Sequence, residues 1–276
     1  MKIGRLVFAL LCRLSPSLAT KWADRLFFTP HSVKRPESEL AYYRSAEKSS
    51  FAFNGQMIAL YQWGQGDEAV LLAHGWGSRG TRLGPLVGPL IEAGYRVVTV
   101  DFPAHGDSGG KMTNLLEITQ LLSRLCERFA PVKALVAHSF GGMATLAAIH
   151  KFDLDVKRAA IIAAPFTMEF IFESFSDQLG LTRQVRARLV TAIVERFEKT
   201  RNVQVFDYSP DRYAHTLQIP FLVFHDKGDR EVAYEQGLRL SSALPNVEFV
   251  STEGLGHRRI FRDPEVVRKV VEFVSQ

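Results

Sequence analysis

The sequence has few cysteines, and this limits the chemistry it can carry. Only Cys12 and Cys126 occur among 276 residues, and neither belongs to a CxxC or Cys/His pattern. Two isolated cysteines cannot form a disulfide framework and give no zinc-ligand spacing. A reducing, cytoplasmic setting therefore fits the chain best.

Long apolar runs are also missing, because no segment approaches the ~20 consecutive apolar residues that a membrane-spanning helix needs. Lys2, Arg5 and the apolar run at 6–11 imitate the start of a signal peptide, but Arg13 interrupts the run. We favour two N-terminal helices, the second starting at Ser15-Pro16. Export remains the alternative if residues 1–23 act as a signal. The apolar stripe expected on the first helix consists of Ile3, Val7, Leu10 and Leu14.

Charge of one sign is not gathered into a long run anywhere in the sequence. The net charge of +5 comes from 34 basic and 29 acidic residues, and the basic ones are scattered. This pattern argues against a nucleic-acid partner. Attachment to a membrane surface stays open, because the basic excess accompanies an N-terminal amphipathic helix. No stable membrane insertion is expected, and the oligomeric state is left open.

From residue 51 onward the pattern predicts a β-hairpin and then alternating strands and helices. Asn54-Gly55 separates two β-rich runs, which is the strongest short hairpin signal. The later short apolar runs cover residues 69–73, 95–100, 132–137, 159–163, 220–224 and 247–250. Because these runs are apolar on both faces, they predict parallel strands covered by helices.

One interval breaks this alternation. From residue 165 to about 216 no strand pattern appears, although a helical stripe does. That stripe consists of Val185, Leu189, Ile193 and Phe197. With 46% hydrophobic residues, the chain can bury one large core. We therefore expect an α/β core at residues 51–164 and 217–276, a helical cap at residues 165–216 and a helical extension at residues 1–50.

A nucleophile motif follows the strand predicted at 132–137. The segment Ala137-His138-Ser139-Phe140-Gly141 precedes an alanine-rich helix and resembles G-x-S-x-G, the nucleophile elbow of the α/β-hydrolase family, with Ala137 replacing the first glycine. Such a sharp turn accepts only small residues two positions before and after the serine. It also brings the serine to a helix N-terminus, which favours developing negative charge. The resemblance implies an α/β-hydrolase fold with a mostly parallel sheet and Ser139 as nucleophile.

Two more loops are similar to segments of that family. Residues 72–77 (Leu-Ala-His-Gly-Trp-Gly) look like its oxyanion loop, which implies that the backbone N–H groups of Trp76 and Phe140 bind a substrate oxygen. Residues 101–108 resemble its D-x-P-G-H-G-x-S loop, with Ala104 in place of a glycine. The residues expected to order these loops, without reacting, are His74, Asp101, His105 and Asp107.

A serine needs a base within hydrogen-bond reach and an acid that orients the base. Residues 225–232 are similar to the family's H-G-x-x-D-x-x-V segment, which puts Asp229 at the acid position and Asp226 where glycine is usual. His257 follows the last strand in a Gly-Leu-Gly-His loop, where the family carries its catalytic histidine. Either residue alone could be a helix cap or a loop residue. The order Ser139, Asp229, His257 is the family's order, and it favours a catalytic triad.

The resemblance implies a serine hydrolase that cleaves carboxylic esters through an acyl-enzyme intermediate. It implies no cofactor, and no ligand spacing among the histidines supports a metal. Thioesters, lactones and C–C bonds remain alternative targets. A ligand-binding member of the fold without chemistry is a further alternative.

Aromatic residues crowd the start of the predicted cap, at positions 166, 170, 172 and 175. Because the chain leaves the sheet there beside Ser139, we expect them to close an apolar pocket over the nucleophile. Phe166 and Phe170 are the candidate substrate-binding residues. A closed pocket would favour short to medium acyl chains, since each methylene gains roughly 0.8 kcal/mol only until the wall is reached.

Overall fold

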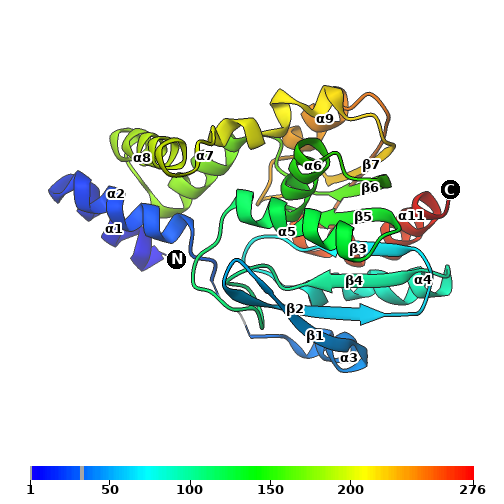
Figure 1. Cartoon of the computed structure of the whole chain (residues 1–276). Helices are drawn as coiled ribbons and strands as arrows, with labels where there is room; N and C mark the ends of the chain where they lie inside the picture. The colour runs from blue at the N-terminus through cyan, green and yellow to red at the C-terminus, as the bar shows by residue number, and fades with distance from the viewer. Residues whose placement is uncertain (1, 32–33) are drawn as a thin grey trace.

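The computed structural model describes residues 2–31 and 34–276, with side chains described from residue 5 onward within these ranges. It contains one eight-stranded sheet flanked by helices (Figure 1). The strands are β1 (Glu47–Phe53), β2 (Gln56–Trp63), β3 (Ala69–Ala73), β4 (Arg96–Val100), β5 (Val132–His138), β6 (Val156–Ile162), β7 (Phe221–Asp226) and β8 (Val247–Thr252). The α-helices are α1 (Lys2–Leu14), α2 (Pro16–Phe27), α3 (Glu37–Ser45), α4 (Val87–Glu92), α5 (Leu115–Arg128), α6 (Phe140–Phe152), α7 (Met168–Leu179), α8 (Arg183–Arg201), α9 (Tyr234–Ala243), α10 (Gly256–Arg259) and α11 (Pro264–Ser275). Short 3-10 helices are η1 (Gly80–Leu86), η2 (Val205–Tyr208), η3 (Pro210–Arg212), η4 (Ala214–Thr216) and η5 (Ile260–Arg262).

The strand order positions the functional end of the sheet. Strands lie in the order β1-β2-β4-β3-β5-β6-β7-β8, with β1 and β2 antiparallel to their neighbours and all later pairs parallel. The chain leaves β3 toward β4 on one side, and later returns to pair β5 on the other side. Loops diverge at the carboxyl ends of β3 and β5, and open α/β sheets bind their ligands at such a point.

The hairpin and the buried strands were predictable from local sequence. Phe53 pairs with Gln56 across the turn, and both turn residues have positive φ, 48° at Asn54 and 75° at Gly55. That is the geometry of a type I′ turn, which asparagine and glycine tolerate. The hairpin strand is longer than predicted, since β1 begins at Glu47.

Both faces of the central sheet are buried, as the apolar runs predict. Along β5, Leu135 and Ala137 join the core that α5 and α6 cover, whereas Ala134 and Val136 join the core under α4 and α11. All four side chains are fully buried. This alternation explains why four consecutive positions of the strand, residues 134–137, are all apolar. The predicted α/β architecture, a mostly parallel sheet covered by helices on both faces, is therefore confirmed.

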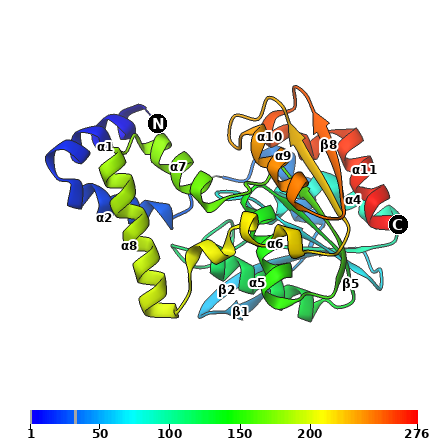
Figure 2. The same ribbon diagram turned by 90° about the horizontal axis from the view of Figure 1, so that it is seen from above.

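The interval between β6 and β7 is helical, and it contains α7, α8 and η2 to η4. The predicted stripe of α8 is buried at all four positions, Val185, Leu189, Ile193 and Phe197. Figures 1 and 2 both show α1 and α2 beside α7 and α8, apart from the sheet. Phe27 at the end of α2 stacks on Phe172 with ring centroids 5.1 Å apart. Asp24 forms two hydrogen bonds, of 2.7 and 2.9 Å, with Arg196.

The first 50 residues therefore do not form one extension, in contrast to the expected division. Helix α1 packs on α7, α2 packs on α8, α3 packs on η1, and residues 47–50 belong to β1. The expected apolar stripe of α1 also faces the other way. Val7, Leu10 and Leu14 are exposed, whereas Phe8 and Cys12 are buried in the core cluster that includes residues of α7 and α8. The side chain of Ile3, the fourth member of the stripe, lies outside the described residues.

The described helices include none that combines the length and apolar character needed to cross a membrane.

Candidate active site

Ser139 lies in a strained turn between β5 and α6. Its φ of +56° is in the region that side chains rarely adopt. The turn is held by a 2.9 Å hydrogen bond from the Ser139 backbone N–H to the carbonyl of Ile162. A side chain at Gly141 would lie 2.4 Å from the His74 carbonyl oxygen, so α6 approaches the end of β3 only because glycine stands there. The small residues of the motif thus allow the turn that exposes the serine at the sheet's edge.

The structure brings Ser139, His257 and Asp229 into one hydrogen-bonded line. His257 Nε2 lies 3.0 Å from Ser139 Oγ, and His257 Nδ1 lies 2.7 Å from Asp229 Oδ2. The side chains of His257 and Asp229 are buried, whereas Ser139 remains partly exposed. These distances allow a proton to pass from the hydroxyl to the imidazole, with the carboxylate fixing the ring tautomer.

Asp229 and Asp226 have different surroundings. Asp229 Oδ1 accepts hydrogen bonds from the backbone N–H groups of Glu231 and Val232 at 2.8 and 2.9 Å, which leaves Oδ2 facing His257. Asp226 Oδ2 instead accepts from Thr252 Oγ1 and from the Leu255 N–H, at 2.8 and 2.9 Å. Burial raises the pKa of Asp226, but these hydrogen bonds outweigh it and the pKa is lowered. Asp226 therefore orders the loop that precedes the histidine.

His138, the residue before the serine, also contacts the histidine loop. Its Nε2 lies 2.8 Å from the main-chain carbonyl oxygen of His257, and the two rings are 4.7 Å apart. Burial is the main cause that holds the pKa of His138 well below its ordinary value, and the electrostatic effect of the nearby His257 adds to it. The neutral ring must carry its proton on Nε2 to donate this bond. Sequence reasoning assigned no role to His138, because a contact across 119 positions has no local signal.

The two residues predicted to bind the substrate oxygen lie next to each other. The ring centroids of Trp76 and Phe140 are 5.2 Å apart, with the rings inclined at 69°. Phe140 is the first residue of α6, where backbone N–H groups have no acceptor within the helix. A side chain at Gly75 would lie 3.0 Å from Ser139 Cβ, so the loop carrying Trp76 passes directly beside the nucleophile. The arrangement suits stabilisation of an oxyanion at Ser139.

His74 and His105 tie the Trp76 loop to its neighbour. The Phe102 N–H donates to His74 Nε2 at 2.9 Å, and the Gly77 N–H donates to His105 Nε2 at 3.0 Å. Both rings must be neutral to accept these bonds. Burial lowers the pKa of His105 to about 4 and the pKa of His74 well below its ordinary value. These contacts are loop-ordering ones, as expected from the sequence.

Asp101 anchors the loop that follows β4. Its carboxylate accepts from the backbone N–H groups of Gly80 and Asp107, both at 2.7 Å, and from the Tyr61 hydroxyl at 2.9 Å. Burial raises the pKa of Asp101, and the two backbone donors oppose that rise. Ala104, which replaces a family glycine, has a φ of +64°. The loop thus keeps a glycine-like backbone conformation at some cost in strain.

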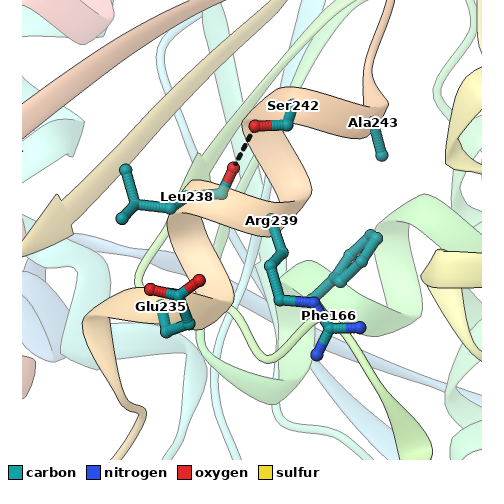
Figure 3. A pocket seen from close by; sticks show the side chains of 6 residues that line it. All are labelled: Phe166, Glu235, Leu238, Arg239, Ser242 and Ala243. Atoms are coloured by element: carbon teal, nitrogen blue, oxygen red, sulfur yellow. Dashed lines mark hydrogen bonds between the residues drawn. The ribbon is translucent and has the colours of Figure 1, made fainter.

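The aromatic residues at the start of the cap have different neighbours. Phe166 is buried beside α9, and the Arg239 guanidinium lies 5.3 Å from its ring centroid. Figure 3 shows Phe166 beside Arg239 in a pocket whose other lining residues all come from α9. Phe172 and Phe175 contact Phe27 of α2, with ring centroids 5.1 and 5.0 Å apart. Phe170 is half-buried, and it is the member of this set that has no such aromatic or cationic neighbour among the described residues.

Within residues 2–31 and 34–276, no group of three or more histidine, cysteine, aspartate or glutamate side chains is arranged to hold a metal ion.

Comparison with known proteins relates this geometry to a family. Residues 70–270 match the family described as the alpha/beta hydrolase family. The human protein ABHD12B is 28% identical over 207 residues, which are 69% of this chain and 55% of that relative. The chain therefore spans about half the length of this curated relative.

Solved structures share the fold at low sequence identity. The esterase Pf2001 of Pyrococcus furiosus is 18% identical with a TM-score of 0.65, and the match covers 89% of this chain and 98% of the esterase. The monoacylglycerol lipase of Paleococcus ferrophilus is 23% identical with a TM-score of 0.62, over 79% of this chain and 98% of the lipase. The fold, the elbow at Ser139 and the match over residues 70–270 lead to one conclusion: this chain belongs to the alpha/beta hydrolase family.

Proposed function

We propose that this protein is a serine hydrolase that cleaves carboxylic esters, with Ser139 as nucleophile, His257 as base and Asp229 as the acid that orients the base. The observation that carries the proposal is the continuous line of hydrogen bonds, 3.0 Å from Ser139 to His257 and 2.7 Å from His257 to Asp229. A serine in a strained, partly exposed turn, with a base at this distance, is a typical activated nucleophile.

In the proposed reaction His257 Nε2 takes the Ser139 proton while Oγ attacks the ester carbonyl. The backbone N–H groups of Trp76 and Phe140 stabilise the oxyanion, and the loss of one such donor typically costs about 3 kcal/mol of transition-state stabilisation. His257 then protonates the departing alcohol, and an acyl-enzyme remains. Water activated by His257 releases the acid, while Asp229 stabilises the imidazolium in each half-reaction. No cofactor or metal takes part.

The proposed substrates are esters with short to medium acyl chains. Phe170 is the candidate that supports this proposal, because it is half-buried at the start of α7 and its ring packs on no aromatic partner among the residues that the structure describes. Phe166 contributes less, since it packs beside Arg239. Thioesters, lactones and C–C bonds share the same mechanism, so a substrate panel must include them.

The test is labelling with a fluorophosphonate, which reacts rapidly only with an activated serine. We expect the label on the peptide containing Ser139, and no label or ester turnover in Ser139→Ala. Alanine should leave the fold intact, because its side chain is no larger than that of serine and the positive φ at position 139 strains both residues to a similar extent. Ser242→Ala on α9, where the hydroxyl bonds only the Leu238 carbonyl, is the matched control. Labelling of another serine, or ester turnover retained by folded Ser139→Ala, would refute the proposal. If the folded wild-type protein is not labelled at all, the result would instead favour a non-catalytic member of the fold.

We also propose a cytoplasmic location. Cys12 and Cys126 are both free and buried, in α1 and α5 respectively. Burial raises the pKa of the Cys126 thiol to about 12, which keeps it protonated and unreactive. Thiols that are neither paired nor reactive suit a reducing compartment.

A further inference from the structure

Exposed apolar side chains are concentrated on α1 and α2. Eleven large apolar side chains are exposed in the described part of the chain, and seven of them lie on these two helices. The seven are Leu6, Val7, Leu10, Leu14, Leu18, Trp22 and Leu26. Their exposed fractions reach 74% at Leu14 and 57% at Trp22. Single exposed apolar residues are common, but such a cluster marks an interaction surface.

These residues form a stripe on each helix. Leu6, Leu10 and Leu14 recur every four residues on α1, and Leu18, Trp22 and Leu26 do the same on α2. Residues with this spacing share one side of a helix. Phe8 and Cys12 lie on the opposite side of α1, whereas Ala19 and Ala23 lie beside the stripe of α2; all four are buried in the core cluster that includes residues of α7 and α8. Each helix thus has one covered apolar side, and its stripe is left uncovered.

Basic residues border the uncovered stripes. Lys21 and Arg25 are exposed, and each directly precedes a stripe residue, Trp22 or Leu26. Arg13 is exposed on α1 and directly precedes the stripe residue Leu14, whereas Arg5 lies against Gly180 at the end of α7. Asp24 is the single acidic residue between positions 1 and 31, and Arg196 holds it in an ion pair at 2.7 Å. The surface defined by the seven apolar residues and the three cations Arg13, Lys21 and Arg25 therefore carries positive charge.

We propose that this surface of α1 and α2 docks on the anionic face of a lipid bilayer, with the apolar stripes in the interface and the cations at the headgroups. Helices with an apolar side, a basic edge and a tryptophan at the boundary bind in this way. A helix of 13 residues, the length of α1, is about 20 Å long and too short to span the bilayer. The docking is therefore peripheral.

The charges favour this occupant over two others. A second copy of the chain would bring the three cations toward like charges, which is unfavourable at an apolar contact. A nucleic acid would pair with the cations but leave the seven apolar side chains in water. An anionic bilayer can pair its headgroups with the cations and also bury the apolar stripes. Figures 1 and 2 show the two helices at the end of the molecule opposite the C-terminus, so the sheet does not obstruct the approach.

The experiment is co-sedimentation of the full chain with vesicles of phosphatidylcholine, with and without phosphatidylglycerol. We expect binding to the anionic vesicles, weaker binding to phosphatidylcholine alone and partial release by salt. Trp22 fluorescence should shift to the blue on binding, whereas Trp22→Ser should remove that shift. The substitution pair Leu10→Ser and Leu14→Ser should weaken binding about tenfold or more, because two leucines no longer enter the interface.

Two matched controls and one independent readout make the result decisive. Met57→Ser with Phe152→Ser removes exposed apolar side chains elsewhere and should leave binding unchanged. Lys21→Glu with Arg25→Glu should weaken binding to anionic vesicles, whereas Lys111→Glu should not. Hydrolysis of a water-soluble ester without vesicles should be unchanged in all of these variants, so failure of the proposed chemistry and failure of docking are separate results. The proposal is overturned by absence of vesicle binding, by binding insensitive to the leucine pair, or by a dimer in solution that the leucine pair dissociates.

Discussion

The ring of His138 is hydrogen-bonded to the main chain of His257: His138 Nε2 lies 2.8 Å from the His257 carbonyl oxygen. The residue before Ser139 is thus tied to the loop that carries His257. Because this link runs through a backbone atom of His257, we expect a substitution at His138 to displace the imidazole relative to Ser139. His138 is therefore a positioning residue for the proposed triad.

We expect His138→Phe to lower kcat about tenfold with little change in KM. Phenylalanine keeps the ring packing but leaves the buried His257 carbonyl without its donor, at a cost of about 1 to 3 kcal/mol. His138→Gln, whose amide can donate, should recover part of the loss. Steady-state kinetics on a soluble ester measure both. An unchanged kcat in His138→Phe would show that the contact does not position the base.

The two aspartates of the β7 loop should respond differently to the same change. Asp229→Asn keeps an oxygen for the Glu231 and Val232 N–H groups but presents an amide to His257, which favours the wrong tautomer. We expect kcat to fall about a thousandfold or more with the fold intact.

Asp226→Asn is the matched comparison. It should lower stability by about 1 to 3 kcal/mol, because Thr252 and Leu255 lose a carboxylate acceptor, and cost less than about tenfold in kcat. Kinetics together with urea unfolding separate the two effects. A larger kcat loss at Asp226 than at Asp229 would mean that the acid has been misassigned.

Stability should fall on acidification because of His105. Its pKa is about 4 in the folded chain and about 6.5 when unfolded, so the unfolded state takes up the proton first. The stabilisation of the folded state by the neutral His105 ring is fully present above about pH 6.5 and is lost as the pH falls toward 4. Between about pH 7 and pH 5, His105 should lower the free energy of unfolding by about 2 kcal/mol.

Urea unfolding at these two pH values tests the effect. His105→Gln should be less stable at neutral pH, but its further loss on acidification should be smaller by about 2 kcal/mol. The exposed His215→Gln should behave like the wild type. Equal acid sensitivity in wild type and His105→Gln would disprove the assignment.

Chain-length preference follows from Phe170. Across p-nitrophenyl esters from acetate to palmitate, we expect kcat/KM to rise about fourfold per methylene and then fall at medium length. Phe170→Ala should reduce the value for medium chains more than for acetate. Phe152→Ala, at the exposed end of α6, should change neither. A steady rise through palmitate would indicate an open groove and contradict the preference.

The sequence predicted those parts of the molecule that depend on local constraints. The turn at Asn54-Gly55 requires two positive φ angles, and the elbow at Ser139 requires small neighbours, so both leave a clear local signal. The buried stretches of the central strands, such as residues 69–73 and 134–137, are apolar at consecutive positions, because helices cover both faces of the sheet. The choice of Asp229 over Asp226 also came from spacing, and it agrees with the hydrogen bond to His257.

Features that depend on distant contacts were not predictable in this way. Helix α1 is apolar on two sides, and its sequence does not specify which side the cap covers; the stripe with Val7 is exposed and the side with Phe8 is buried. Likewise, Phe172 and Phe175 looked like pocket residues, but Phe27 of α2 is their neighbour. Tertiary packing decided both outcomes.

The ion pair between Asp24 and Arg196 joins positions 172 residues apart and has a consequence for biosynthesis. At about 5 to 20 residues per second, a ribosome needs about 10 to 35 s to make α8 after α2 has emerged. During that time the inner sides of α1 and α2 have no partner from the cap. Helices α1 and α2 therefore reach their native contacts with α7 and α8 long after they are made, and we expect the nascent chain to depend on a holdase chaperone during this interval.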